Sequence, residues 1–374
     1  MKTKRQKKCL GCQVNKMMKI LILPGDGVGP EVTKQARKII NKVSKIYNLD
    51  IDIKEALFGG VAVDKYDKPF PDETKSEINK ADAILLGAVG GEKYDLLPKE
   101  KKPESGLLEL RKQLNLFINI RPIISFSELS NSSTIKSEYI DNLDIVIIRE
   151  LISGLYFGEP RGFNEDSTEA FNTMRYNVNE INRISEYALN LANSRSKKLC
   201  SVDKANVLEV SQLWRSTVNA VSKKYKDVEL SHMYVDNAAM QLVQNPKQFD
   251  VIVTENLFGD ILSDIASVLT GSIGMLPSAS LNEKNFGVYE PIHGSAPDIA
   301  GKDIVNPIAA ILSVAMMFQH TFDRVDIYNS ILNAVKSTLQ NKKFTKDIAN
   351  NKDYISTESM GDYIVEKIKG ESND

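Results

Sequence analysis

Residues 18–32 read MKILILPGDGVGPEV, a short apolar run that leads through a glycine-rich turn into a segment with helical spacing. The apolar run predicts a buried strand, and Pro30 suits the first turn of the helix that follows. Further apolar runs predict buried strands at 82–89, 144–150, 198–203 and 250–255. Helical periodicity separates these runs, so the sequence predicts an α/β fold in which helices cover a sheet.

The glycine-rich turn only partly matches the fingerprint of a dinucleotide-binding Rossmann fold. That fingerprint is GxGxxG with an acidic residue about 20 positions later. Here Gly25, Gly27 and Gly29 are followed by Pro30, so the third fingerprint glycine is absent. We therefore predict a tight turn that begins a helix, with at most a lesser contact to a cofactor.

Residues 306–322 predict a further helix, with Asn306 as its N-cap and Pro307 at its first position. Alanine and serine are frequent in this segment, which favours a helix packed closely on several sides. Residues 156–176 are polar, aromatic and irregular over a long stretch. Excursions of this length usually carry function or form an interface.

Composition limits the classes of protein that the chain can belong to. The chain has 374 residues, of which 42% are hydrophobic, and this length favours about two domains. Residues 1–17 hold six of the 48 Lys and Arg and none of the 49 Asp and Glu, which leaves a net charge of −7 on the rest. A negative body argues against nucleic-acid binding, and no apolar run is long enough to predict a membrane span.

The basic N-terminal segment, residues 1–17, is predicted to be a disordered extension, with Met18 at the start of the folded part. Cys9 and Cys12 form a CxxC within it, which supplies only two of the four ligands of a structural zinc site. A metal or redox role for this CxxC is the alternative. With Cys200 there are three cysteines, too few for a disulfide framework, so we predict a reducing, cytoplasmic location.

Two aspartates in residues 256–280 are the most informative polar pair. Asp260 and Asp264 stand four residues apart, so a helix places both carboxylates on one face. Their flanks are apolar, and two close like charges favour a cation between them. Oxygen ligands point to Mg²⁺ or Mn²⁺ rather than zinc. A solvated acidic face is the alternative.

Further polar residues follow predicted strands, where open α/β sheets place ligands. Asp236 is a third candidate metal ligand, and Lys204 is a candidate general base. Three arginines beside apolar segments suit a dicarboxylate held by bidentate contacts, with surface ion pairs as the alternative; they are Arg111, Arg121 and Arg149. Tyr156 is a candidate proton donor, or else a core or interface aromatic.

Five motifs, taken together and in order, resemble the β-decarboxylating 2-hydroxyacid dehydrogenases, the isocitrate/isopropylmalate dehydrogenase family. The resemblance covers roughly residues 18–370. Its motifs are PGDGVGPEV, LYFGEPRG, SVDKANVLEV, NLFGDILSDIASVLTGSIGMLPSAS and EPIHGSAPDIAGKDIVNP. The resemblance implies a two-domain fold with a mixed sheet flanked by helices, not a Rossmann fold. It also implies an enzyme that uses NAD and Mg²⁺ or Mn²⁺.

The resemblance assigns roles residue by residue. The arginines that bind the substrate carboxylates match Arg111, Arg121 and Arg149. The metal ligands match Asp236, Asp260 and Asp264, of which Asp236 also touches the substrate. The base that takes the hydroxyl proton matches Lys204, and the acid that protonates carbon after CO₂ loss matches Tyr156.

Substrate choice depends on the residues before the first arginine. Members that act on isocitrate carry a polar asparagine where this chain has Leu107, which Leu108 follows. An apolar wall favours the alkyl group of an isopropylmalate-type substrate, because an unpaired carboxylate against leucine is costly; ordinary helix core is the alternative. Asn206 matches a residue near substrate and nicotinamide, and Val207 would add an apolar contact from the partner chain.

The nucleotide site is expected in the HGSAPD loop. The residues that the resemblance implies there are His293, Gly294, Ser295, Ala296, Pro297, Asp298 and Asn306, with Val28 near the adenine. Asp298 stands where NADP-dependent relatives carry a lysine. A carboxylate accepts hydrogen bonds from the ribose diol and repels a 2′-phosphate, so NAD is predicted.

The resemblance also implies an assembly. Lys204 and Asp236 would complete the active site of a partner subunit, so a homodimer is expected, with residues 156–176 as its intersubunit arm. The first domain is predicted to hold 18–116 and 271–374, and the second 117–270. Two other functions stay open: oxidation of D-malate or tartrate by a related enzyme, and a catalytically silent regulatory subunit.

Overall fold

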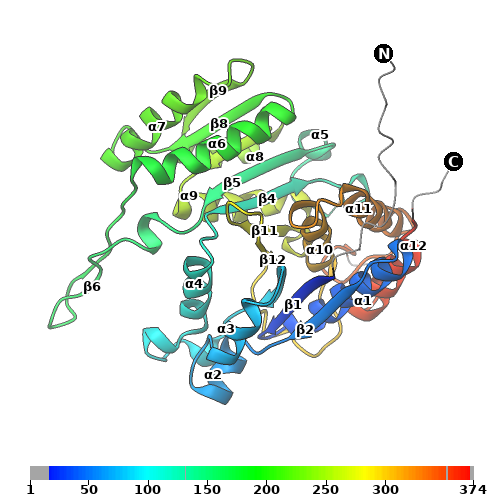
Figure 1. Ribbon diagram of the computed structural model, residues 1–374. Coiled ribbons are helices and arrows are strands. Elements are labelled where there is room, and N and C mark those ends of the chain that lie inside the picture. The colour runs from blue at the N-terminus through cyan, green and yellow to red at the C-terminus, as the bar shows by residue number, and fades with distance from the viewer. Residues whose placement is uncertain (1–16, 131, 351–352, 371–374) are drawn as a thin grey trace, which may run out of the picture.

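The structure is a computed structural model that describes residues 17–130, 132–350 and 353–370 (Figure 1). Cys9, Cys12 and all but the last residue of the predicted disordered extension lie outside the described residues. Within the described ranges, no helix is both long enough and apolar enough to span a membrane.

One ten-stranded sheet forms the centre of the molecule. Its first five strands, in spatial order, are β2 (Ile51–Glu55), β1 (Met18–Gly25), β3 (Ala83–Ala88), β12 (Gly287–Pro291) and β11 (Pro277–Leu281). The other five are β4 (Ile118–Ile124), β5 (Asp144–Glu150), β10 (Val251–Thr254), β8 (Lys198–Asp203) and β9 (Glu229–Tyr234). All five strands predicted from apolar runs are confirmed.

The sheet is mixed, as the resemblance implied. β11 pairs antiparallel with β12 and β4, and β4 pairs antiparallel with β5. The pairs on either side of this centre are parallel. The antiparallel centre rules out the all-parallel Rossmann sheet, so the predicted fold class is confirmed. Strands from 18–116 and 271–374 are neighbours in one half, and those from 117–270 in the other; the division into two domains stays a prediction.

Helices cover both faces of the sheet (Figure 1). In the half around β1 they are α1 (Gly29–Tyr47), α2 (Gly60–Tyr66), α3 (Asp72–Ile78), α4 (Pro103–Gln113), α10 (Ile308–His320), α11 (Val325–Gln340) and α12 (Thr357–Lys367). In the other half they are α5 (Ser137–Ile140), α6 (Val178–Ser194), α7 (Glu209–Ser222), α8 (Val235–Gln244) and α9 (Asn256–Ser267). On β5, Ile148 packs with the α6–α7 side and Ile147 with the α8–α9 side, as strand alternation requires.

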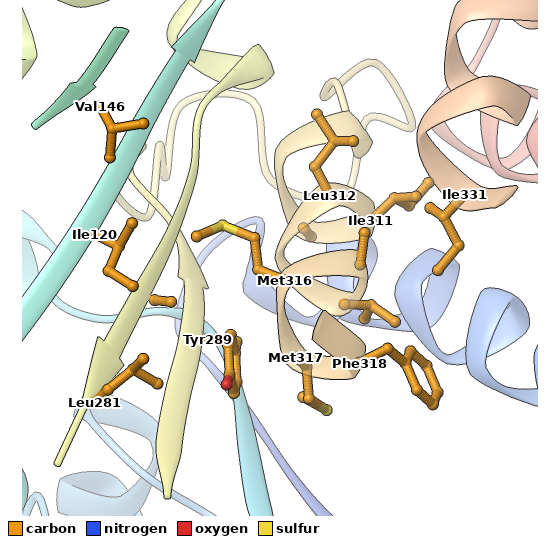
Figure 2. Packing of buried hydrophobic residues seen from close by; sticks show 14 of the residues in the cluster. Ile120, Val146, Leu281, Tyr289, Ile311, Leu312, Met316, Met317, Phe318 and Ile331 are labelled. Carbon is orange, nitrogen blue, oxygen red and sulfur yellow. The ribbon is translucent and has the colours of Figure 1, made fainter. Parts of the chain in front are cut away.

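Helix α10 lies at the centre of the largest apolar cluster. Figure 2 shows Met316 directed toward Ile120 and Val146 of the sheet, and Ile311 beside Ile331 of α11. Every residue from 308 to 318 is buried, so the predicted packing on several sides is confirmed. The helix begins at Ile308, one residue later than predicted. The Asn306 side chain still accepts the N–H of residue 308 at 3.0 Å, which is the hydrogen bond expected of an N-cap residue.

Residues 156–176 extend away from the body (Figure 1). Their only regular pairing among the described residues is a short antiparallel ladder of β6 (Gly162–Phe163) and β7 (Ala170–Phe171). Phe163 is 72% exposed and Phe171 is 44% exposed. Two exposed aromatic side chains on a projecting hairpin are typical of a surface that contacts another chain.

Candidate active site

The carboxyl ends of four parallel strands meet at one edge of the sheet. β5, β10, β8 and β9 run in the same direction and are neighbours in that order. Arg149 lies near the end of β5, Lys204 follows β8, and Asp236 follows β9 in the first turn of α8. Because α9 starts directly after β10, Asp260 in its second turn also lies near this edge. The topology therefore explains why residues far apart in sequence gather there.

One group of side chains, here called the arginine cluster, comprises Arg111, Arg121, Arg149, Tyr156 and Asp260. Asp260 is its centre: Oδ1 accepts Arg149 Nη1 at 2.5 Å and Arg121 Nη2 at 3.3 Å. Its other oxygen, Oδ2, accepts the Tyr156 hydroxyl at 2.8 Å. Arg111 belongs to the group through its charge, which helps to lower the pKa of Asp260. The structure thus brings together five of the residues that the sequence singled out.

Burial governs the charges of this cluster. Desolvation lowers the pKa of Arg149 to about 10, and Arg121 adds to this effect through like-charge repulsion. Burial acts to raise the pKa of Asp260, but Arg149, Arg121 and Tyr156 outweigh it and hold that pKa below its usual value. Burial and Asp260 raise the pKa of the Tyr156 hydroxyl, so the phenol carries its proton at neutral pH.

Arg111, on α4, has an unsatisfied donor. Its Nη2 donates to Glu290 Oε1 of β12 at 3.0 Å, but its buried Nε has no hydrogen-bond partner among the residues that the structure describes. A buried charged donor without an acceptor is costly unless a ligand supplies one. Leu107 and Leu108 precede Arg111 by four and three residues and so share its helix face.

A second group, the lysine pair, comprises Lys204 and Asp236, whose Nζ and Oδ1 lie 2.6 Å apart. No hydrogen bond or ion pair between described residues joins it to the arginine cluster. Across residues 17–130, 132–350 and 353–370, no three Asp, Glu, His or Cys side chains come together as metal ligands. One chain therefore does not assemble all three predicted metal ligands, although Asp260 and Asp264 share α9 as predicted.

Residues beside the lysine pair are open to solvent. Asn206 is exposed, and Val207 is 61% exposed, an unusual environment for a valine. Neither residue reaches the arginine cluster through a hydrogen bond recorded for the described chain.

The 293–298 loop packs on the opening glycine turn. Val28 N–H donates to Ser295 O at 2.8 Å, and a Cβ on Gly27 would lie only 1.9 Å from that oxygen. This close approach, together with the positive φ of 55°, explains the glycine at position 27. The Val28 side chain is fully buried, so this residue positions the loop through its backbone.

The same loop offers polar groups to a ligand. Burial lowers the pKa of His293, and its buried Nε2 has no partner within the described part of the chain. Gly294, Pro297 and Asp298 are exposed, whereas Ala296 is half-buried. Asn306 is buried, and its Nδ2 donates to Asp347 Oδ2 at 3.1 Å, so its side chain is held by the protein.

Residues 19–364 match the isocitrate/isopropylmalate dehydrogenase family. The chain belongs to this family. A relative named 3-isopropylmalate dehydrogenase from Prochlorococcus marinus is 54% identical over 358 residues, which cover 95% of this chain and 100% of the relative. A relative with the same name from Wolinella succinogenes is 54% identical over 351 residues, 93% of this chain and 97% of the relative.

A solved structure supports the same family. Isocitrate dehydrogenase from Methylococcus capsulatus has a TM-score of 0.85 at 33% identity, covering 94% of this chain and 100% of that one. The resemblance inferred from five sequence motifs is therefore confirmed, and so is the fold that it implied.

Several residues in the candidate active site and the opening turn were not predicted from the sequence. Asp26, in the opening turn, accepts the N–H groups of Gly60, Val61 and Gly90, each at 2.8 Å, and so connects this turn to the start of α2 and to the loop that follows β3. Asn119 and Asn256 each contact a cluster arginine. A polar residue within an apolar strand or at a helix start was the available signal.

Glu150, next to Arg149, is fully buried. It accepts hydrogen bonds from Tyr176 OH at 3.1 Å and Ser153 N–H at 3.0 Å, and Arg183 Nη2 lies 3.5 Å away. Burial raises the pKa of Glu150 to about 7, against the opposing effect of Arg183. The folded chain therefore binds more protons than the unfolded chain between pH 4.5 and about 7, and its stability falls as pH rises through that window.

We expect Glu150→Gln to remove this part of the pH dependence. Between pH 5 and 8 the variant should lose less stability than the wild type, by at most about 3 kcal/mol. Urea unfolding at both pH values measures the difference, with exposed Glu283→Gln as control. Equal losses in the wild type and Glu150→Gln would contradict the assignment.

Proposed function

We propose that this chain is an NAD-dependent, divalent-metal-dependent enzyme that oxidises and decarboxylates 3-isopropylmalate to 4-methyl-2-oxopentanoate in leucine biosynthesis. The observation that carries this proposal is the arginine cluster, with the unpartnered Nε of Arg111 beside an apolar helix face. Guanidinium groups bind carboxylates, and a dicarboxylate with an alkyl substituent complements both features. Family membership and the names of the relatives support the same reaction.

The chain supplies two groups for proton transfer. Lys204 Nζ would take the proton of the C2 hydroxyl as the C2 hydride leaves. After CO₂ departs, the protonated Tyr156 hydroxyl would donate to the carbon left behind. When bound, NAD⁺ accepts the hydride, and the divalent ion polarises the C2 oxygen and stabilises developing negative charge.

The donor set fits Mg²⁺ or Mn²⁺. Asp260 and Asp264 lie on one face of α9 and offer only oxygen atoms. We propose that Asp236 of the partner subunit supplies the third carboxylate, because the described residues of one chain do not bring Asp236 together with Asp260 and Asp264.

A shared site requires a homodimer, which we propose. Exposed apolar side chains on α8 and α9 would form part of the interface; they are Met240, Val243 and Ile261. The 156–176 hairpin would serve as the intersubunit arm, and Asn206 and Val207 would reach the partner's substrate. We retain two domains, 18–116 with 271–374 and 117–270, and a cytoplasmic location, as parts of the proposal.

The apolar face of α4 suggests the substrate specificity, and the 293–298 loop suggests the cofactor specificity. Leu107 and Leu108, on the face of α4 that carries Arg111, would contact the isopropyl group. His293 Nε2, which has no partner among the described residues, offers a hydrogen-bonding position to the nucleotide. We place NAD on 293–298 and Asn306, with the adenosine ribose at the exposed carboxylate of Asp298, which disfavours the 2′-phosphate of NADP.

A panel of substrates with both cofactors tests the proposal. With Mg²⁺ and NAD⁺, kcat/KM should be highest for 3-isopropylmalate and far lower for isocitrate, D-malate and tartrate. NADP⁺ should be a poor substitute. Comparable kcat/KM on D-malate would overturn the choice of substrate, since an apolar pocket rejects a missing alkyl group only modestly. No turnover of any of the four would favour a silent regulatory subunit.

A further inference from the structure

Two fully buried asparagines stand behind two arginines of the cluster. Arg121 Nε donates to Asn119 Oδ1 at 2.7 Å. Arg149 donates to Asn256 Oδ1 twice, from Nε at 3.0 Å and from Nη2 at 2.8 Å. In each case one amide oxygen holds the guanidinium group on its Nε side, and both asparagines are 0% exposed.

Each amide is fixed in turn by its nitrogen. Asn119 Nδ2 donates to Ser278 Oγ at 2.9 Å and to Ser280 Oγ at 3.1 Å, both on β11. Asn256 Nδ2 donates to the backbone carbonyls of Leu151 at 3.0 Å and Ser153 at 3.1 Å. A buried amide with both ends satisfied has a single orientation, so it can impose that orientation on the arginine.

One terminal nitrogen of each arginine contacts Asp260. Arg149 is left with Nη1, which donates to that carboxylate. Arg121 keeps Nη2 for Asp260, while its Nη1 donates to Ser263 Oγ. The outward edges of both guanidinium groups therefore converge on one point.

Neutrality is the chemical reason for an amide here. An aspartate would orient a guanidinium group equally well, but it would also cancel the positive charge that attracts an anion. An asparagine orients the guanidinium group without cancelling its charge. This difference matters where the arginine, besides contacting Asp260, must bind the carboxylate of a ligand.

We propose that Asn119 and Asn256 are positioning residues that aim Arg121 and Arg149 at the substrate carboxylates while leaving their charge available. This inference rests on the proposed function for the identity of the substrate, but not for the presence of a carboxylate-binding site.

Asn119→Asp isolates the charge. The Ser278 and Ser280 hydroxyls can rotate to donate to the new carboxylate, so the variant keeps its packing and the position of Arg121. We expect KM for 3-isopropylmalate to rise about tenfold or more with kcat changed much less, because the lost interaction exists before and during the reaction. An unchanged KM in a folded variant would overturn the role of Asn119.

Asn256→Ala isolates the orientation, measured alone and in an Arg149→Lys background. Lysine lacks the Nε and Nη2 donors, so Asn256 has nothing to aim there. We expect at least a tenfold loss of kcat/KM in the wild-type background and less than a threefold further loss beside Arg149→Lys. Equal losses in both backgrounds would mean a general structural role and would overturn the proposal.

Calorimetric binding of malonate separates this inference from the proposed function. Asn119→Asp and Asn256→Ala should both weaken malonate binding, whatever substrate the enzyme turns over. Asn282→Ala serves as control, because it removes an amide that bonds Leu114 O and two backbone N–H groups but touches no arginine. If the wild type does not turn over 3-isopropylmalate but both variants bind malonate more weakly, the proposed function is wrong and the positioning role of Asn119 and Asn256 is supported. If the wild type and both variants bind malonate equally, that positioning role is wrong.

Discussion

Lys204→Met is expected to lower kcat for 3-isopropylmalate about 10³-fold, within the range by which a positioned general base accelerates a reaction. Methionine keeps the length and apolar stem of lysine but cannot accept a proton. Lys204 follows β8, and its ammonium group pairs with the exposed Asp236 and lies over the ring of the exposed Tyr234, so the fold should tolerate the change. Initial rates of NADH formation at saturating substrate measure the effect.

The control is Lys197→Met, which changes the lysine that precedes β8. Lys197 is half-exposed and pairs with Asp227 at 3.4 Å, an ion pair at the other end of β8. It should leave kcat within twofold of the wild type, because surface ion pairs contribute little. NAD⁺ affinity, measured by fluorescence titration, should be the same in all three proteins. A kcat for Lys204→Met within tenfold of the wild type would remove this residue from the role of base.

The fold was largely predictable because strands such as β3 and β5 are buried on both faces. Runs such as 82–89 and 144–150 need apolar side chains on either side of the sheet, and this leaves a continuous signal in the sequence. The order of strands in the sheet was harder to predict from sequence. The antiparallel direction of β11 and β4 relative to their neighbours depends on long-range pairing, and the mixed sheet was predicted only through the family resemblance.

The candidate site was predictable where its chemistry is charged. Arg111, Arg121 and Asp260 stand out against apolar flanks, and the structure places them close enough for their charges to act on one another. Asn119 and Asn256 did not stand out, because a neutral amide in a sequence has many ordinary roles. The hydrogen bond of Asn256 to Arg149 joins α9 to β5, 107 residues apart, so the sequence alone does not show it. Asn119 bonds Arg121 within β4, and there a polar residue in an apolar strand was the only signal.

Spacing along the chain also does not predict which of the three candidate metal-ligating aspartates lie close together in one chain. Asp260 and Asp264 share a helix face, which a period of 3.6 residues predicts. Asp236 lies at the same edge of the sheet but follows β9, two strands beyond β10, and it pairs with Lys204, which follows β8. The separation of the lysine pair from the arginine cluster is the feature that a second subunit would explain.

Mixing two inactive variants tests that explanation. Lys204→Met disables the lysine pair and Asp264→Asn disables the metal-binding face of α9, and each homodimer should be inactive. If every site combines the arginine cluster of one subunit with the lysine pair of the other, a mixed dimer regains one intact site. Random exchange makes half of the dimers mixed, so about one quarter of wild-type activity should return.

The matched control mixes Lys204→Met with Asp236→Asn. Both changes fall in the lysine pair, so each site of a mixed dimer receives one damaged pair and no activity should return. Native mass spectrometry of the two mixtures verifies that subunits have exchanged. Recovery in the first mixture alone identifies a shared site. Failure of both mixtures, with exchange demonstrated, would place the lysine pair and the arginine cluster of one chain in the same site and require the two groups to move together on ligand binding.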